Sequence, residues 1–251
     1  MSYAFFLGLA SFAAYVLLFD HLIKNNFFLK ANFSKVNFQK ANDRKLKAHI
    51  SVITFFIFAW FGAKVLTFFT HPFFHNNEFN ENTESFFSSP FFEPHYLFGG
   101  GGVFYGSLLG VILASYLLQF IFKISFFNSL TLPILIGHFI GRIGCLVAHC
   151  CYGSIITIMG FTFEFPAVEI EMIVLALMII STFKFKSFSF RTYLIIYSFA
   201  RFILEFTRAE LDRYIVNNLS TSQWISLSLI IYSIFIYPKI KLRPNDEKYP
   251  S

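Results

Sequence analysis

The sequence predicts an all-α integral membrane protein of about seven transmembrane helices, with the N-terminus outside and the C-terminus in the cytoplasm. Three observations predict this fold: the composition, the spacing of apolar stretches and the distribution of lysine and arginine. Of the 251 residues, 56% are hydrophobic and 14% are charged, whereas charged residues make up about a quarter of an ordinary soluble domain. No polar stretch is long enough to fold by itself, so we expect one polytopic membrane domain over residues 1–251.

Apolar stretches of the length needed to cross a bilayer recur along the chain. A transmembrane helix takes about 20 mostly apolar residues, and seven stretches approach this length: 3–19, 49–70, 97–122, 131–150, 165–182, 192–207 and 221–238. No basic residue precedes the first stretch, whereas a secretory signal normally begins with one. We therefore expect the first stretch to be retained as a membrane helix.

Lysine and arginine decide the orientation, because they accumulate in cytoplasmic loops. With the N-terminus outside, 15 of the 20 basic residues fall in the inner segments 20–48, 123–130, 183–191 and 239–251. The outer loop 71–96 contains four glutamates and no lysine or arginine. The topology thus accounts for the formal net charge of +6, and we expect no nucleic acid partner.

Five basic residues lie elsewhere: Lys64, Arg142, Arg201, Arg208 and Arg213. Lys64 is expected to extend its side chain to the outer interface. A charge at the centre of a membrane helix costs about 2.5 to 3.5 kcal/mol on insertion scales, and such residues usually face a polar cavity or a functional site. The four arginines converge on the outer half of the predicted bundle.

Arginines in the outer half of a membrane protein favour a phosphate site. The guanidinium is always charged and its planar donors bind two oxygens at once, so a phospholipid headgroup or a phosphate leaving group would fit. The alternative is structural: Arg142 and Arg201 pair with Glu171 and Glu205 inside the bundle. Glu205 follows Arg201 by four residues, which places the two on one helix face.

Cysteines and glycines near these arginines allow several interpretations. Cys145 and His149 have the i,i+4 spacing of zinc ligands, but the sequence offers no second half-site. We therefore expect no metal and interpret the cysteines as buried thiols, with a disulfide as an alternative, except between the neighbours Cys150 and Cys151. The glycines of 99–110 favour close helix packing or an irregular backbone that lines a cavity.

Four segments, in order, resemble the prolipoprotein diacylglyceryl transferase family. "GRIGCLVAHCCYG" (141–153) resembles the family's "GRIGNFINGELYG", and "YSFARFILEFTRAELD" (197–212) resembles "YGIARFLVEFFREPD". "GGVFYGSLLG" (101–110) is similar to "GGLSFHGGLIGG", and "FPAVEIE" (165–171) is similar to "HPTQLYE". A seven-helix topology with the N-terminus outside is also expected of this family.

The resemblance implies a reaction in the bacterial inner membrane. The family moves the diacylglyceryl group of phosphatidylglycerol to the thiol of a lipobox cysteine in a prolipoprotein signal peptide and releases glycerol phosphate. This chemistry needs a thiolate nucleophile, cationic donors at the departing oxygen and a side opening for the lipid. No cofactor is implied.

The resemblance also implies roles for individual residues. Arg142 and Arg201 are expected to bind the phosphate, and Arg208 is expected to make a further contact to the headgroup or peptide. Tyr197, Glu205 and Glu171 are expected to orient these groups. Close approach of backbone or lipid is implied at three glycines, Gly141, Gly144 and Gly153.

Departures from the family pattern put the standard reaction in question. Tyr105 stands at the family's catalytic histidine, and a phenol with a pKa of about 10 is a poor base at neutral pH. Cys145, Ala148 and Cys150 replace two asparagines and a glutamate, and His149 replaces a glycine. Two alternatives therefore stay open: an altered relative that binds an anionic phospholipid or transports a small anion, and a related transferase with another acceptor. The sequence carries no signal for an oligomeric state.

Overall fold

The computed structural model describes residues 3–24, 39–70, 104–122, 124–149, 153–158, 161–185, 187–208, 215–216 and 219–237. Residues 25–38 of the basic loop 20–48 and all of the acidic loop 71–96 lie outside these residues. So do the glycines 99–102, Cys150, Cys151 and Arg213.

Seven α-helices lie in the described part of the chain, and each overlaps one predicted span. They are α1 (Tyr3–Lys24), α2 (Gln39–Thr70), α5 (Phe104–Phe122), α6 (Phe127–Val147), α7 (Ala167–Lys184), α8 (Phe190–Leu204) and α9 (Thr221–Ile231). A 3-10 turn (Glu205–Thr207) extends α8, and a π-helical turn (Tyr232–Ile236) extends α9. The predicted helical fold is therefore confirmed at this level.

Four of the described helices are long and apolar enough to cross a membrane: Phe5–Lys24, Lys45–Leu66, Phe104–Phe122 and Phe127–Val147. Large apolar side chains cover the outside of the bundle; Phe12, Phe120 and Phe183 are 66%, 73% and 73% exposed. The interior holds apolar core residues together with buried serines and charged side chains. An apolar exterior around a partly polar interior is the arrangement of an integral membrane protein. The full number of spans and the orientation stay predictions.

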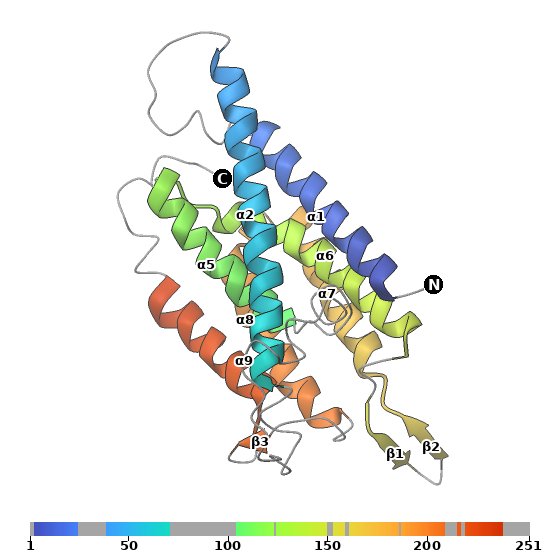
Figure 1. The fold of residues 1–251 in the computed structure, drawn as a ribbon. Helices are drawn as coiled ribbons and strands as arrows, with labels where there is room; N and C mark the ends of the chain where they lie inside the picture. Colours follow the sequence, from blue (N-terminus) through green and yellow to red (C-terminus); the bar gives the residue numbers. More distant parts are fainter. Residues whose placement is uncertain are drawn as a thin grey trace, which may run out of the picture.

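The helices pack as neighbouring pairs that alternate in direction (Figure 1). The main contacts join α2 to α5, α1 to α6, α8 to α9 and α6 to α7. The ends of α6 and α8 therefore lie at the same end of the bundle as the starts of α7 and α9, toward the bottom of Figure 1. This arrangement brings together the segments 141–153 and 197–208, which carry the arginines.

Glycines set the contact between α2 and α5. A methyl group on Gly106 would overlap the carbonyl oxygen of Gly62, and one on Gly110 would overlap that of Phe58. The two backbones therefore touch without intervening side chains, as at other small-residue interfaces in membranes. Close packing, one of the two interpretations of these glycines, is confirmed for Gly106 and Gly110.

Two short antiparallel hairpins supplement the helices and were not predicted. β1 (Ile155–Ile158) pairs with β2 (Phe161–Glu164) in the register Ile155 to Glu164, and β3 (Ile215–Val216) pairs with β4 (Leu219–Ser220). Both hairpins lie at the end of the bundle that carries the arginines. Lys64 also differs from expectation, because its residue is buried in α2, only 4% exposed.

The α2 and α5 contact makes a prediction about stability. Gly106→Ala should lower the free energy of unfolding by about 1 to 3 kcal/mol, because the added methyl group forces two backbones apart. Gly8→Ala on α1 is the matched control, since nothing lies within 4 Å of a methyl group there. Unfolding of both variants in detergent measures the difference, and equal stability would contradict the backbone contact.

Candidate active site

Glu171 on α7 lies at the centre of a buried polar cluster. Its Oε1 is 2.8 Å from Nη2 of Arg142 on α6, and its Oε2 is 3.6 Å from Nη1 of Arg201 on α8. The Tyr197 hydroxyl donates to Oε1 at 3.0 Å. The Glu171 side chain is only 4% exposed, so one carboxylate joins three helices in the interior.

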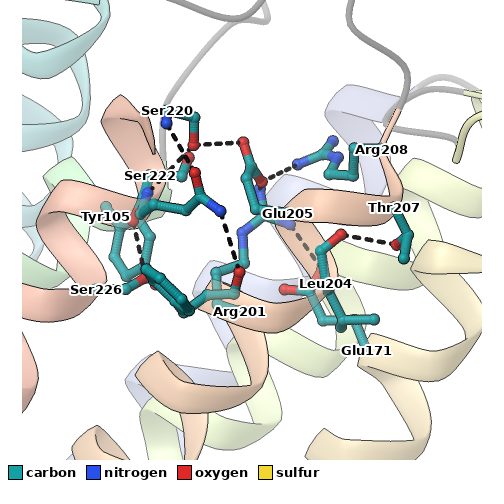
Figure 2. A network of polar contacts seen from close by, with 12 residues as sticks. Tyr105, Glu171, Arg201, Leu204, Glu205, Thr207, Arg208, Ser220, Ser222 and Ser226 are labelled. Carbon is teal, nitrogen blue, oxygen red and sulfur yellow. Dashed lines mark hydrogen bonds and ion pairs between the residues drawn. The ribbon is translucent and has the colours of Figure 1, made fainter. Parts of the chain in front are cut away.

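A second carboxylate, Glu205, continues the cluster toward the end of the bundle. Its Oε2 is 3.0 Å from Nη2 of Arg201 and 3.7 Å from Nη1 of Arg208. Ser220 donates its hydroxyl to Oε1 at 3.1 Å, and Figure 2 shows Glu205 held between Ser220 and Arg208. Ser220 also forms a capping box with Gln223 at the start of α9. The cluster is thereby tied to the first turn of α9.

Opposite charges alternate through this cluster in the order Arg142, Glu171, Arg201, Glu205 and Arg208. The three guanidiniums and two carboxylates leave one net positive charge among these five groups. The ion pairs of the structural alternative are therefore present. Guanidinium donors gathered in this way also have the chemistry that binds the oxygens of a phosphodiester.

The segments that carry the arginines are also joined through their backbones. Gly153 forms a β-bridge with Arg208, and the amide and hydroxyl of Ser154 both donate to the Thr207 carbonyl, at 2.8 Å and 3.2 Å. A methyl group on Gly153 would overlap the Phe165 carbonyl, so close approach of backbone occurs here. Open space surrounds the position of a methyl group on Gly141. Gly144 is buried in α6.

Tyr105 lies at the start of α5 and contacts α9. Its hydroxyl is 2.5 Å from Oγ of Ser226, and Ser226 donates to the Ser222 carbonyl at 2.8 Å. Because Ser226 has a single hydroxyl proton, Tyr105 must be the donor in their shared hydrogen bond. Figure 2 shows this pair beside the arginine cluster. Tyr197 donates its hydroxyl to Glu171, which in turn lies 3.6 Å from Arg201, so its orienting role stays a prediction.

His138 belongs to the cluster and was not assigned from the sequence. Its Nε2 lies 3.7 Å from Oε1 of Glu171, and its ring stacks on Phe104 with the centroids 3.6 Å apart. His138 precedes Arg142 by four residues, so the two share a face of α6. That spacing was the signal that could have identified it.

Two other residues of the segment 141–153, Cys145 and His149, lie near the end of α6. Cys145 is a buried free thiol, and Nη1 of Arg142 lies 3.9 Å from its Sγ. Across the described residues, no group of three His, Cys, Asp or Glu side chains is placed to hold a metal. His149 follows the C-cap of α6 with φ 45°, a conformation for which glycine is the usual residue. The glycine in the resembling family segment is therefore explained by the end of the helix.

The shared carboxylate makes a prediction about stability. Glu171→Gln should lower the free energy of unfolding by about 3 kcal/mol or more, because removing one partner leaves buried charges uncompensated. Glu169→Gln, an exposed position in the first turn of the same helix, is the control. Adding Arg142→Gln to Glu171→Gln should restore part of the loss. Unfolding in detergent tests the three variants, and a Glu171→Gln protein as stable as the control would contradict the assignment.

The end of α6 makes a second prediction. His149→Gly should raise the free energy of unfolding by about 0.5 to 1 kcal/mol, because it removes the Cβ from a left-handed residue. Ala148→Gly, one residue earlier at φ −83°, should lower stability instead. The same unfolding measurement compares them, and a loss of stability in His149→Gly would refute the conformational argument.

Comparisons with known proteins identify the family of the chain. A family model described as "Prolipoprotein diacylglyceryl transferase" matches residues 2–238. The chain is 33% identical over 172 residues to a Clostridium perfringens protein named "Phosphatidylglycerol--prolipoprotein diacylglyceryl transferase 2", covering 60% of this chain and 66% of that protein. A Clostridium tetani protein named "Phosphatidylglycerol--prolipoprotein diacylglyceryl transferase" is 32% identical over 160 residues, covering 55% of this chain and 64% of that protein.

These two matches span slightly less than two thirds of each relative's own length. The family model, in contrast, spans nearly all of this chain and includes every residue of the arginine cluster. The chain belongs to the prolipoprotein diacylglyceryl transferase family.

Proposed function

We propose that this protein transfers the diacylglyceryl group of phosphatidylglycerol to the thiol of a lipobox cysteine in a prolipoprotein and releases glycerol phosphate. The reaction takes place in the bacterial cytoplasmic membrane, with the arginine end of the bundle facing outward. The observation that carries the proposal is the convergence of Arg142, Arg201 and Arg208, from two helices and a turn, around Glu171 and Glu205 at one end of the bundle. Family membership and the names of the two relatives support it.

The guanidinium groups suit both the substrate and the product. Phosphatidylglycerol carries one negative charge on its phosphodiester, whose oxygens a guanidinium can bind in pairs. During transfer the bond between the glycerol carbon and its oxygen breaks, and a second negative charge develops on the departing phosphate. Arg142 and Arg201 would stabilise that charge by aimed guanidinium donors in a site that excludes water. Arg208, at the end of the cluster, would contact the glycerol headgroup or the peptide.

An apolar groove supports entry of the lipid from the bilayer. It lies between α7 and α8, has a volume of about 430 Å³ and is lined by residues that include Val174, Met178, Ile195 and Phe199. Val174 follows Glu171 by three residues, and Ala200 in the lining precedes Arg201. An acyl chain in this groove would therefore extend away from a phosphate held at the arginines.

A second candidate function is binding of an anionic phospholipid without transfer. Its support is the Tyr105 hydroxyl, which donates to Ser226 instead of facing the arginines. A neutral phenol held in this way would position α5 against α9 but would not activate a thiol. Formation of product distinguishes the two functions.

The deciding experiment uses the full chain in vesicles with radiolabelled phosphatidylglycerol and a lipobox peptide that has one free cysteine. Peptide-linked label and released glycerol phosphate are measured together, and the same peptide with serine in place of cysteine is the acceptor control. Equal amounts of the two products would support transfer. Lipid binding without either product would overturn transfer and leave the binding function.

Arg142→Ala should lower the transfer rate by about 100-fold to 1000-fold, the usual effect of removing one donor to a developing oxyanion. Arg142→Lys should restore only part of the rate, because an ammonium lacks the planar pair of donors. Arg191→Ala at the opposite end of α8 is the control. Tyr105→Phe should retain more activity than Arg142→Ala, because its hydroxyl donates to Ser226. Full activity in Arg142→Ala would refute the phosphate assignment.

A further inference from the structure

Packing fixes the His138 ring in place, but neither ring nitrogen makes a hydrogen bond to a described residue. Phe104 stacks on one face at 3.6 Å between centroids, and Tyr197 meets the ring edge-to-face at 4.8 Å. The side chain is 3% exposed. Neither ring nitrogen makes a hydrogen bond to any residue that the structure describes. A buried polar group without a partner needs an explanation, and a polar group of a bound substrate would supply one.

His138 also lies at the depth where the reacting atoms would be. A phospholipid in the outer leaflet has its phosphate farther from the membrane centre than the glycerol carbons that carry its acyl chains. With the phosphate at Arg142 and Arg201, the carbon under attack lies on the inner side of the arginines. His138 precedes Arg142 on α6, which is one helical turn, or about 5.4 Å, toward the membrane centre.

Resting on the proposed function, we propose that His138 accepts the proton of the lipobox thiol as the sulfur attacks the glycerol carbon. The carbon–sulfur bond forms while the bond from that carbon to the phosphate oxygen breaks. Its electron pair departs on glycerol phosphate, which leaves as a dianion, and the proton stays on His138. The products are a thioether, glycerol phosphate and an imidazolium, which returns its proton to water after release.

The neighbours of His138 suit this role. Glu171 faces Nε2 at 3.7 Å, so a proton on Nε2 points to the carboxylate and leaves the lone pair of Nδ1 as the acceptor. The same carboxylate would stabilise the imidazolium. Arg142 and Arg201 are the other charged groups near the ring, and Tyr197 faces it with a neutral phenol that donates to Glu171. A phosphate bound at the two arginines would offset their repulsion of the imidazolium.

The test compares two lipobox peptides that differ only in the acceptor, cysteine or selenocysteine. A selenol is already ionised at neutral pH, so it needs no base. In the full chain in phosphatidylglycerol vesicles at pH 7, His138→Gln should lower transfer to the thiol by about 100-fold or more. Transfer to the selenol should fall less than about 10-fold, because the base contribution is no longer needed. His21→Gln, an exposed position at the other end of the bundle, is the control.

A pH profile gives a second readout that does not depend on the variant folding. In the wild-type protein, thiol transfer should fall as the pH drops and His138 becomes protonated, while selenol transfer should not follow that profile. In His138→Gln, thiol transfer should instead rise steadily toward the thiol pKa of about 8.5.

Three results would overturn the inference. Equal losses for the thiol and the selenol in His138→Gln, with wild-type transfer intact, would reduce His138 to a structural residue and leave the proposed function standing. An unchanged thiol rate in His138→Gln would do the same. No product from the wild-type protein with either peptide, although lipid binds, would remove the proposed function and the inference together.

Discussion

The shared Glu171 carboxylate is the interaction on which this end of the bundle depends. Through Arg142 and Arg201 it joins α6 and α8 to α7, and through Tyr197 it holds a second point on α8. Arginines are costly in the hydrocarbon region, so their burial is favoured by carboxylate partners: Glu171 for both arginines and Glu205 for Arg201. In the same way, Glu205 pairs with Arg208 and accepts a hydrogen bond from Ser220 at the start of α9. The position of four helices is therefore fixed by two carboxylates.

Much of the fold could be predicted because membrane helices follow from length and composition alone. Each predicted span coincides with a described helix, and the buried arginines were recognisable by their cost. The pairing of these arginines with glutamates was only one of two interpretations. Arg201 and Glu205 are close on one helix, but Arg142 and Glu171 meet only because α6 packs on α7. The structure contains both ion pairs, and the role of these arginines in binding phosphate stays a proposal.

Other features were missed for identifiable reasons. Lone histidines on apolar helices are common in cores, so the four-residue spacing of His138 and Arg142 was not enough to assign His138 to the site until its distance from Glu171 was known. The hairpin of β1 and β2 is explained by the β-branched run Ile155, Ile156, Thr157 and Ile158, which ends shortly before Gly160. This run is too short to give the signal of a membrane span. The left-handed residue His149 could not be foreseen, because nothing in the local sequence fixes where α6 ends.

The alternation of arginine and glutamate has a consequence for turnover. On the proposed function, a phosphate that enters between Arg142 and Arg201 would compete with Glu171 for both guanidiniums, and Glu171 would keep Tyr197 as a partner during the exchange. The same carboxylate would then compete with the departing dianion. The internal anions would thus limit product inhibition, because they would lower the affinity for every phosphate and free the site for the next lipid.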